Sequence, residues 1–580
     1  MSAVMEAREP SAEYLSPLRP PLVQHFELMA VAPGGVAKLR ELILTLAVQG
    51  KLVPQDPKDE PASDLLKKIR TEKDRLIAEG KIKRDKPPVP IAEEEKPFSL
   101  PDSWEWVRIP QVTHGLGQGE PSSSFSYIDV ASIDNLGGRV APQVQVLEAA
   151  DAPSRARKNV SMGTVIYSTI RPYLKNIAVI EHNYSPKAIA STAFAVMHPH
   201  TGVLPKYLLH YLRSRPFTEY VNSKAVGVAY PAINDANFFE GVIALPPAAE
   251  QTRIVTRVEE LMRLCDALEA KVRLEAEQHA CLLGTLLGML TDSSTPKEWA
   301  VNWQRVADHF ELLFDRPEAV DALEQTILQL AVRGLLVQQD PSDEPAEAFL
   351  DRIHAERQIR LPSQRNKPEV FRSTTESEPY ELPSGWVWTT IENLAVVGTG
   401  TTPSRDNTAY FSGGTIPWVT SGETGQPFIK STSQHVTQAA LANTSLTLYP
   451  VGTLIVAMYG QGKTRGQVSE LCLEATTNQA CAAIVLTERS EPHRGFVKLF
   501  FEKSYDEIRE LSAGGAQPNL NVGKVKASLI PMPPLAEQAR IVARVTELRR
   551  LCADLRHRLE CSSATQTALA DALIDQALAG

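Results

Sequence analysis

The chain of 580 residues has few cysteines, no long apolar run and no excess of positive charge. Its six cysteines include no Cys-x-x-Cys pair, so neither a disulfide framework nor a zinc site of that kind is expected. No segment approaches the roughly 18 consecutive apolar residues of a membrane helix, and the first residues lack the pattern of a signal peptide. These absences favour a cytoplasmic protein with reduced thiols that stays outside the membrane.

The net charge of −9 does not by itself indicate a nucleic-acid-binding protein, because phosphate binding requires a basic surface. The acidity is unevenly distributed along the chain. Residues 100–245 contain 12 Lys+Arg against 11 Asp+Glu, and residues 382–531 contain 11 of each. Each of these two segments is close to neutral and can carry a basic face, and a partner is expected to supply much of the phosphate neutralisation.

The chain contains an internal repeat, which is its most informative feature. His25–Leu28 returns as His309–Leu312, and residues 39–73 return at 323–357 with the same offset. A second block, Pro-Pro-x-x-Glu-Gln and the helix-like residues after it, begins at Pro246 and returns at Pro533. The segments between the blocks resemble each other at only a few positions. A shared frame with divergent inserts predicts one scaffold that presents two different binding domains.

Apolar spacing indicates which secondary structure the frame and the inserts adopt. Leu39, Leu42 and Leu46 lie on one face of a helix that ends near Gly50, and Asp59 is predicted to cap the next helix. Each insert opens with Leu-Pro-x-x-Trp and continues with short β-type runs. We expect an α+β (mixed α/β) fold with two globular domains separated by a pair of long antiparallel coiled-coil helices. The predicted segments are an N-terminal extension (1–24), a helical repeat with a linker (25–99), the first domain (100–245), a central long helix (246–290), a linker with the second helical repeat (291–381), the second domain (382–531) and a C-terminal long helix (532–580).

Heptad spacing in the two long helices predicts that they pack against each other. The apolar seams are Ile254, Val258, Leu261, Cys265, Leu268 and Val272 in the first helix and Ile541, Val545, Leu548, Cys552, Leu555 and Leu559 in the second. Glu275 and His279 interrupt the first seam, and Ser562 and Gln566 interrupt the second at matching places. The seams are expected to resume at Leu282, Leu286 and Met289 in the first helix and at Leu569 and Leu573 in the second. Matched polar interruptions are expected to fix the register of the pair.

No catalytic motif is complete. Residues 457–464 nearly match a phosphate-binding P-loop, but the following residues turn back toward extended structure, whereas a P-loop needs a helix there. The glycine-rich residues 115–119 lack the spacing of a dinucleotide fingerprint. The acidic residues Asp56, Asp59 and Glu60 lie in a repeated turn, which favours a structural role over a metal site. We predict a protein that is not an enzyme, and NTP use through Gly462-Lys463-Thr464 remains an alternative.

The remaining candidate is a DNA-binding surface formed by matched loops of the two inserts. Arg and Lys pair with guanine edges or phosphates, Asn and Gln pair with adenine, and Ser pairs with either backbone or base. The candidate contact residues are Ser168, Arg171, Tyr173, Lys175, Asn176, Tyr230 and Asn234 in the first insert and Arg405, Ser421, Tyr459, Gln461, Lys463, Arg465, Gln517, Asn519 and Asn521 in the second. No metal site is expected.

With these motifs in this order, the chain resembles the specificity (S) subunit of a Type I restriction-modification system. The marks are Leu-Pro-x-x-Trp at each insert's start, residues Thr415–Gly422, residues Gly514–Asn521, and Pro-Pro-x-x-Glu-Gln at both exits. The first insert lacks the Ile-Pro-Trp segment of the second. The resemblance implies that each insert is a target-recognition domain that reads one half of a bipartite target in the DNA major groove. It also implies that the helices set the unread spacer.

The same resemblance implies partners for the chain. Two modification (methyltransferase) subunits are expected to dock on the helices and two restriction (motor-nuclease) subunits to complete the assembly, in phage defence. S-adenosylmethionine, ATP and Mg are expected on those partners, with no cofactor in this chain, and the methylated base is expected to be adenine at N6. A coiled-coil assembly protein whose inserts bind protein remains the alternative of a different class.

Overall fold

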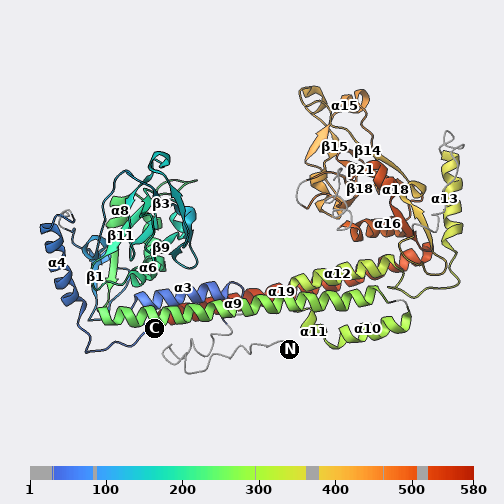
Figure 1. Ribbon diagram of the computed structural model, residues 1–580. Coiled ribbons are helices and arrows are strands. Elements are labelled where there is room, and N and C mark those ends of the chain that lie inside the picture. The colour runs from blue at the N-terminus through green and yellow to red at the C-terminus, as the bar shows by residue number, and fades with distance from the viewer. Residues whose placement is uncertain are drawn as a thin grey trace. The chain divides into compact units, whose positions relative to one another are not determined.

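The computed structural model describes residue 29 and residues 32–82, 88–293, 295–360, 378–460, 463–505 and 520–579. Contacts divide the chain into two units, Met1–Ala276 with Ser562–Gly580 and Glu277–Cys561. Each unit contains one insert and one copy of the repeated helices, and Figure 1 labels their elements. The predicted N-terminal extension and the candidates Gln461, Gln517 and Asn519 lie outside the described residues.

The first unit begins with the predicted amphipathic helix. This helix, α3 (Gly35–Val48), buries Leu39, Leu42 and Leu46, and Gly50 follows its end with a φ of 70°, as the sequence predicts. The other helices of the unit are α4 (Ala62–Ala78), α5 (Ile109–Val112), α6 (Pro205–Arg213), α7 (Arg215–Lys224), α8 (Asp235–Phe239), α9 (Ala248–Thr291, which continues into the second unit) and the 3₁₀ turns η1 (Glu93–Glu95), η2 (Val130–Ser132), η3 (Ala149–Asp151) and η4 (Pro172–Leu174).

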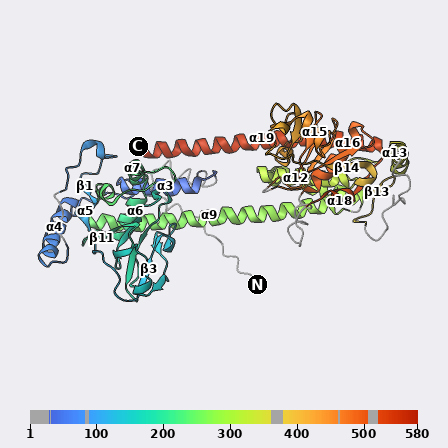
Figure 2. The same cartoon turned by 90° about the horizontal axis from the view of Figure 1, so that it is seen from above.

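Two sheets form the first insert. A six-stranded sheet has the order β2-β11-β8-β9-β5-β4, and a four-stranded sheet has the order β6-β3-β10-β7. Their strands are β2 (Thr113–His114), β3 (Phe125–Ile128), β4 (Ile133–Asp134), β5 (Arg139–Val140), β6 (Gln145–Leu147), β7 (Ala156–Asn159), β8 (Val165–Ser168), β9 (Ile177–Val179), β10 (Ala188–Ser191) and β11 (Phe194–Pro199). Helix α6 packs on β8 and β9 and contacts α3 (Figure 2). Its Tyr207 and Tyr211 are buried in the same core as α3.

A separate two-stranded ladder joins the two ends of the first insert. Strand β1 (Glu105–Arg108) pairs antiparallel with β12 (Val242–Leu245), so that Glu105 lies opposite Leu245. Paired residues on neighbouring strands lie about 5 Å apart. The chain therefore enters and leaves this domain on adjacent strands, and α9 begins shortly after the exit strand.

The second unit repeats this plan with different sheets. Its ends are joined by β13 (Val387–Thr390) and β22 (Leu529–Met532), and the sheets have the orders β14-β21-β18-β19-β16 and β17-β15-β20. The strands are β14 (Ala395–Thr399), β15 (Ile416–Val419), β16 (Phe428–Ile429), β17 (Gln434–Val436), β18 (Leu454–Ala457), β19 (Val468–Leu471), β20 (Thr476–Thr477) and β21 (Cys481–Leu486). The helices are α10 (Pro296–Asp308), α11 (Phe310–Leu313), α12 (Pro317–Val332), α13 (Ala346–Arg360), α14 (Ile391–Leu394), α15 (Gln438–Asn443), α16 (Glu491–Lys503), α18 (Val522–Ala527), α19 (Leu535–Ala579, which continues into the first unit) and the 3₁₀ turns η7 (Thr408–Tyr410) and η8 (Ser421–Gly425).

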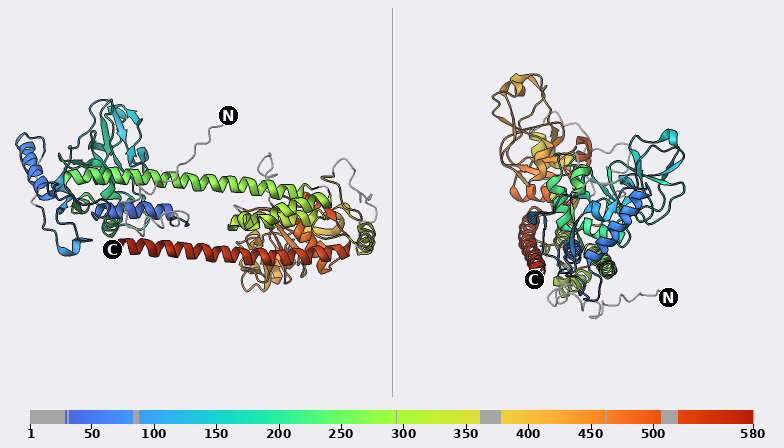
Figure 3. Two further views of the ribbon diagram at one scale, coloured as in Figure 1. Left: turned by 90° about the horizontal axis from the view of Figure 1, so that it is seen from below. Right: turned by 90° about the vertical axis from the view of Figure 1, so that its left-hand side faces the viewer.

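The long helices α9 and α19 each contribute to both cores. In the first unit, Ile254, Val258, Leu261 and Cys265 of α9 are buried in one core with α3 and with Ala570 of α19. In the second unit, Ile541, Val545 and Cys552 of α19 share a core with α12 and with Leu287 of α9. Figure 3 shows α9 as the long green helix and α19 as the long red helix. These seam residues are buried as predicted, but their cores also contain residues of the short helices α3 and α12. The short repeated helices belong to these cores, through Leu39 and Leu42 of α3 in the first unit and Leu323 and Ile327 of α12 in the second.

The predicted continuation of the seams is only partly right, because Leu286 and Leu573 pack against the two cores as expected. Val272, Leu282 and Leu569 are 41%, 53% and 47% exposed, and the second core contains Leu283 and Leu287 instead. A straight helix of 3.6 residues per turn drifts by about 20° per heptad from a strict seven-residue repeat. Between Val258 and Leu282, which are more than three heptads apart, this drift amounts to most of the angle between successive residues. The buried face therefore moves from Leu282 to Leu283.

The polar interruptions have other contacts than those predicted. His279 lies 3.2 Å from the carbonyl oxygen of Leu312 and 3.6 Å from the carboxylate of Asp315, within the second unit. Ser562 and Gln566 are exposed. The predicted role of His279 in fixing the register of the two long helices is therefore wrong.

The repeated motifs meet at one junction in the first unit. The indole nitrogen of Trp104 donates a hydrogen bond of 2.9 Å to Oε2 of Glu250, at the start of α9. One turn later, Arg253 forms a two-point ion pair of 2.5 and 3.2 Å with Asp59. The predicted capping role of Asp59 is wrong, because α4 begins only at Ala62. Asp59 instead ties the repeated turn to the long helix.

The second unit contains the same junction. Trp386 donates to Oε2 of Glu537 at 2.9 Å, and Arg540 binds Asp343 at 2.5 and 3.3 Å. The Leu-Pro-x-x-Trp motif, the repeated acidic turn and the Glu-Gln block are far apart in sequence. They meet in the same arrangement in both units. This contact fixes each domain to the helix that follows it.

The two buried junction carboxyl groups differ in one contact. Oε1 of Glu250 accepts a hydrogen bond of 2.5 Å from Gln55, whereas Oε1 of Glu537 is buried without a hydrogen-bond partner among the described residues. Burial raises the pKa of both carboxyl groups, and it raises the pKa of Glu537 to about 7. Gln55 lowers the pKa of Glu250, and the second unit has no such donor at Glu537 among its described contacts.

Candidate nucleic-acid interface

Two loops of the first insert, both selected from the sequence, are joined by backbone contacts. The amide of Arg171 donates to the carbonyl of Pro231 at 2.8 Å, and the amide of Ile233 donates to the carbonyl of Thr169 at 3.0 Å. Ala232 also bridges to Ile170 in the other loop. We call residues 169–175 together with 226–233 the platform. The sequence predicted these loops as a group, and the structure brings them together.

Two cationic residues of the platform have left-handed backbone conformations. Arg171 and Lys175, on either side of η4, have φ values of 49° and 51°, and they are the only non-glycine residues with positive φ in the described part of the chain. Such a conformation costs about 1–3 kcal/mol and persists only where the surroundings impose it. The Arg171 guanidinium lies 4.3 Å from the ring centroid of Tyr230, which orients its charge on the other loop.

The platform exposes an unusual number of apolar side chains. Tyr173 is 51% exposed, Leu174 43%, Val226 78%, Val228 105% and Tyr230 67%. Sequence reasoning selected the two tyrosines and missed Leu174, Val226 and Val228, because an apolar residue is ordinarily predicted to be buried. Exposed apolar side chains gathered in one place indicate a contact surface.

A half-buried arginine is connected to the platform through a neighbouring turn. Arg213 at the end of α6 donates to the carbonyl oxygens of Asn135 and Leu136, at 2.6 and 3.1 Å, in the turn between β4 and β5. Burial lowers the pKa of Arg213. Asn135 in turn donates to the carbonyl of Leu174 at 3.5 Å. The core helix and the platform are thus connected through one surface turn.

Three predicted contact residues form side-chain hydrogen bonds within their own domains. Ser168 is 1% exposed and its hydroxyl donates to the carbonyl of Ile170 at 2.9 Å, so it is not available to a base. The side-chain oxygens of Asn234 and Asn521 accept from the third residue of α8 and α18, at 2.7 and 2.9 Å. These two asparagines occupy matching positions in the repeat, and both cap helices. Asn176 is half-buried, and its backbone carbonyl holds the amide of Ser168.

The corresponding loop of the second insert connects β18 to β19. Tyr459 is 37% exposed, Lys463 is exposed and Arg465 is half-buried. After Lys463 the chain turns back into β19, with the amide of Gly466 bonded to the carbonyl of Ala457. A P-loop requires a helix at this point, so the geometry argues against NTP binding here.

The other two candidates of the second insert lie on different segments. Arg405 is exposed before η7, and Ser421 is half-buried at the start of η8, where its carbonyl accepts from Thr424 at 2.8 Å. Turn η8 contacts β18 and β19, and the hydroxyl of Thr424 donates to Oε1 of Gln467, at the end of the β18–β19 loop, at 3.4 Å.

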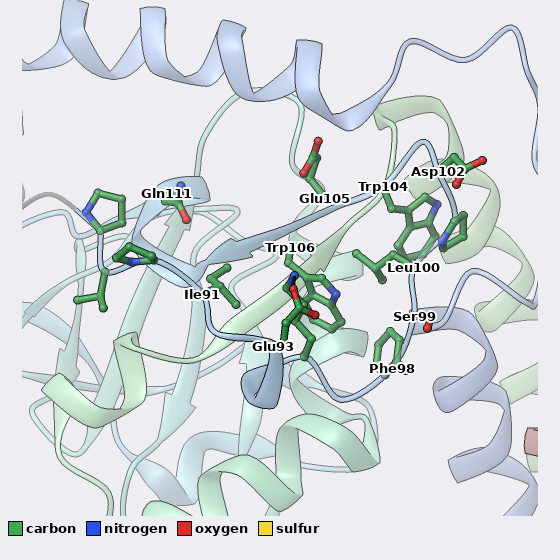
Figure 4. Close-up of a pocket in the computed structure, with 15 residues that line it drawn as sticks. Ile91, Glu93, Phe98, Ser99, Leu100, Asp102, Trp104, Glu105, Trp106 and Gln111 are labelled. Atoms are coloured by element: carbon green, nitrogen blue, oxygen red, sulfur yellow. Dashed lines mark hydrogen bonds and ion pairs between the residues drawn. The ribbon is translucent and has the colours of Figure 1, made fainter.

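A large hollow of the first unit lies outside the platform. It encloses about 750 Å³ between the linker at 88–103 and strand β1, and its lining includes Phe98, Trp104 and Trp106 (Figure 4). The rings of Phe98 and Trp106 lie 5.0 Å apart. None of the candidate contact residues lines this hollow.

A cluster of three histidines was considered as a metal centre. His114 lies 4.7 and 5.2 Å, ring to ring, from His200 and His198. Burial and the two neighbouring histidines lower the pKa of His114 to about 4. Over the described ranges, no three His, Cys, Asp or Glu residues are arranged to hold a metal ion. The cluster is a packed part of the domain core.

Comparison with known proteins places the chain in a family. The family of Type I restriction modification DNA specificity domains matches residues 154–278 and 383–560. The specificity subunits of the Type I restriction enzymes EcoAI and EcoEI of Escherichia coli are each 32% identical, over 568 and 571 residues, with 94% of each chain covered. A chain from a solved structure on complex assembly and conformational transition of the type I R-M system has a TM-score of 0.51 at 23% identity. That match covers 83% of this chain and 99% of the other, and it shows a shared fold.

The chain belongs to the specificity subunits of Type I restriction-modification systems. It is the DNA specificity subunit, which is the non-catalytic part of such an enzyme. Its fold is mixed α/β, with two regions of the family's DNA specificity domain and two long helices. None of the helices in the described ranges has the length and apolar character that crossing a bilayer would require.

Proposed function

We propose that the platform is the surface with which the first domain reads one half of a bipartite DNA target in the major groove. The observation that supports this most directly is the pair of left-handed cations, Arg171 and Lys175, on joined loops that also expose aromatic rings. Strained residues held in place by their surroundings are characteristic of binding sites. Arg171, stacked on Tyr230, presents a planar donor that suits a guanine edge or a phosphate.

We propose the β18–β19 loop, with Tyr459, Lys463 and Arg465, as the corresponding surface of the second domain. This loop follows the same kind of buried strand as the platform loop after β8. Its residue types suit base edges and phosphates in the same way.

The decisive experiment is a domain exchange in the assembled complex. Residues 100–245 are replaced by the corresponding insert of another specificity subunit, and methylated adenines are mapped in DNA from cells that carry the complex. The proposal predicts a change in one half of the methylated sequence only. A change in the whole target, or no change at all, contradicts it.

A point variant tests the platform itself. Arg171→Ala is expected to weaken binding to the mapped target by about 5- to 150-fold, which corresponds to the loss of a contact worth about 1–3 kcal/mol. Arg155→Ala is the matched control, because it removes the same charge from an exposed position of the same domain outside the platform. Equal losses in the two variants would show that only net charge matters.

We propose that the long helices set the spacer between the two half-sites and dock two modification subunits. Two restriction subunits, with ATP and Mg, and S-adenosylmethionine on the methyltransferases complete the proposed assembly in the cytoplasm of a bacterium or archaeon. Residues 269–278 of α9 are all exposed, so an insertion there disturbs no packed side chain. Four added residues in α9, about 6 Å of helix, should lengthen the tolerated spacer while leaving both half-sequences unchanged.

The exposed apolar side chains of the platform also fit the alternative of a protein-binding insert. In that case the domain exchange would alter subunit composition, measured by mass photometry of the purified complex, and leave the methylated sequence unchanged.

A further inference from the structure

The platform exposes both cationic and apolar side chains, and DNA binding by the cations does not explain the apolar ones. Leu174 and Val228 have no polar group with which to bind a base edge or a phosphate, yet they are 43% and 105% exposed. Leaving such side chains in water forgoes part of the 1.5–3 kcal/mol that burying each would contribute. They lie on the two loops that the backbone bonds of Arg171 and Ile233 join.

The backbone holds these apolar side chains outward. Gly227 has a φ of 112°, and a Cβ built on it would lie 2.9 Å from the carbonyl oxygen of Tyr230, so this turn requires glycine. The turn places Val228 at its exposed tip. On the other loop, η4 places Leu174 between the left-handed residues Arg171 and Lys175, next to the supporting turn at Asn135.

The major groove of DNA offers one apolar group to such a surface. Every base pair presents hydrogen-bond donors and acceptors there, and only thymine adds a methyl group, at C5. Apolar side chains pressed against other base edges would remove water from polar groups without replacing the hydrogen bonds, which is unfavourable. An apolar tip beside oriented cations therefore fits a segment that contains thymine.

We propose that Leu174 and Val228 read thymine methyl groups in the first half of the target. This inference rests on the proposed function of the platform and makes it more specific. The cations position the domain on the duplex, and the two apolar side chains discriminate thymine from cytosine and from uracil. Any half-site with a methylatable adenine contains at least one thymine opposite it.

The experiment replaces each thymine of the first half-site in turn by deoxyuridine, which removes the methyl group and nothing else. Binding of the assembled complex to each duplex is measured by fluorescence anisotropy. One buried methyl contact, at about 0.8 kcal/mol, corresponds to a three- to fourfold loss of affinity. In the double variant Leu174→Ala/Val228→Ala, the same deoxyuridine substitution is expected to have no effect, because the contact is already absent.

Matched controls separate this contact from general surface effects. Val146→Ala and Met162→Ala alter side chains that are 53% and 56% exposed on the same domain outside the platform, and both should retain the thymine preference of the unaltered complex. All these positions are exposed, so the variants are expected to fold.

The possible failures are distinguishable. If deoxyuridine has no effect while Arg171→Ala still weakens binding, the platform binds DNA but the methyl-reading proposal is overturned. If neither change matters, the proposed function of the platform fails as well. Loss of a partner subunit from the Leu174→Ala/Val228→Ala complex, with DNA affinity unchanged, would assign these side chains to a protein contact and also overturn the proposal.

Discussion

Replacing Glu537 by glutamine tests the physical account of the junctions. Glu537 is 1% exposed, Oε2 accepts from Trp386, and burial raises the pKa of this carboxyl group from 4.5 to about 7. Below pH 4.5 the group is protonated in both the folded and the unfolded chain. Between pH 4.5 and 7 it ionises only when unfolded, so the free energy of unfolding falls as pH rises. Above pH 7 both forms are ionised and the loss is complete.

The magnitude follows from the size of the shift. Each pKa unit corresponds to 1.36 kcal/mol, so the loss of stability at Glu537 amounts to as much as about 3 kcal/mol at pH 8. Glutamine keeps an acceptor for Trp386 and cannot ionise. Glu537→Gln should therefore gain stability relative to the unaltered chain between pH 5 and pH 8, even if the new amide has a constant cost at both pH values.

The assay must report on this junction, because a chain with two units does not unfold in one step. A ¹⁹F label on Trp386, as fluorotryptophan, follows unfolding of the second junction in denaturant titrations at each pH. Glu250→Gln, followed at Trp104, is the matched control. Gln55 already binds the first carboxylate, so its pH-dependent gain should be smaller. A pH-independent difference for Glu537→Gln, or a larger gain for Glu250→Gln, would refute the reasoning.

Three further predictions concern single contacts. Asn234→Asp should keep the cap of α8 and leave the methylated sequence unchanged. Asn234→Ala should lower the free energy of unfolding by about 1 kcal/mol, measured by thermal unfolding. A changed methylated sequence in the aspartate variant would instead show that Asn234 contacts a base. Asp343→Asn should destabilise the second junction by about 1–3 kcal/mol, since the half-buried Arg540 loses a charged partner, and hydrogen exchange at the start of α19 measures this. Gly227→Ala should distort the platform turn and weaken DNA binding, whereas Gly284→Ala, on the open face of α9, should leave DNA binding unchanged. If the two variants bind DNA with equal affinity, the platform turn does not contact DNA.

The general plan of the fold could be predicted because the signals for its helices lie in short stretches of sequence and occur twice. Leu39, Leu42 and Leu46 share a helical face, and Gly50 ends that helix, so neighbouring residues carry the whole signal. The seams at Val258 and Val545 were predictable for the same reason.

Other features depend on contacts that no local pattern records. Trp104 and Glu250 are 146 positions apart, and nothing in either motif shows that an indole donates to that carboxylate. Val228 was missed because apolar character normally predicts burial. The cap formed by Asn234 had a local signal, an asparagine directly before a short helix, but its amide also suits adenine, and the sequence does not separate the two roles.

The short ladders β1–β12 and β13–β22 have an evolutionary consequence. In each half the inserted segment begins and ends on adjacent strands, and the tryptophan at its start bonds to a glutamate of the repeated block that follows it. Genetic recombination within those blocks replaces everything between them without altering either anchoring pair. New sequence preferences can thus arise through one crossover in each flanking block, and the incoming segment needs only two neighbouring ends to be accommodated.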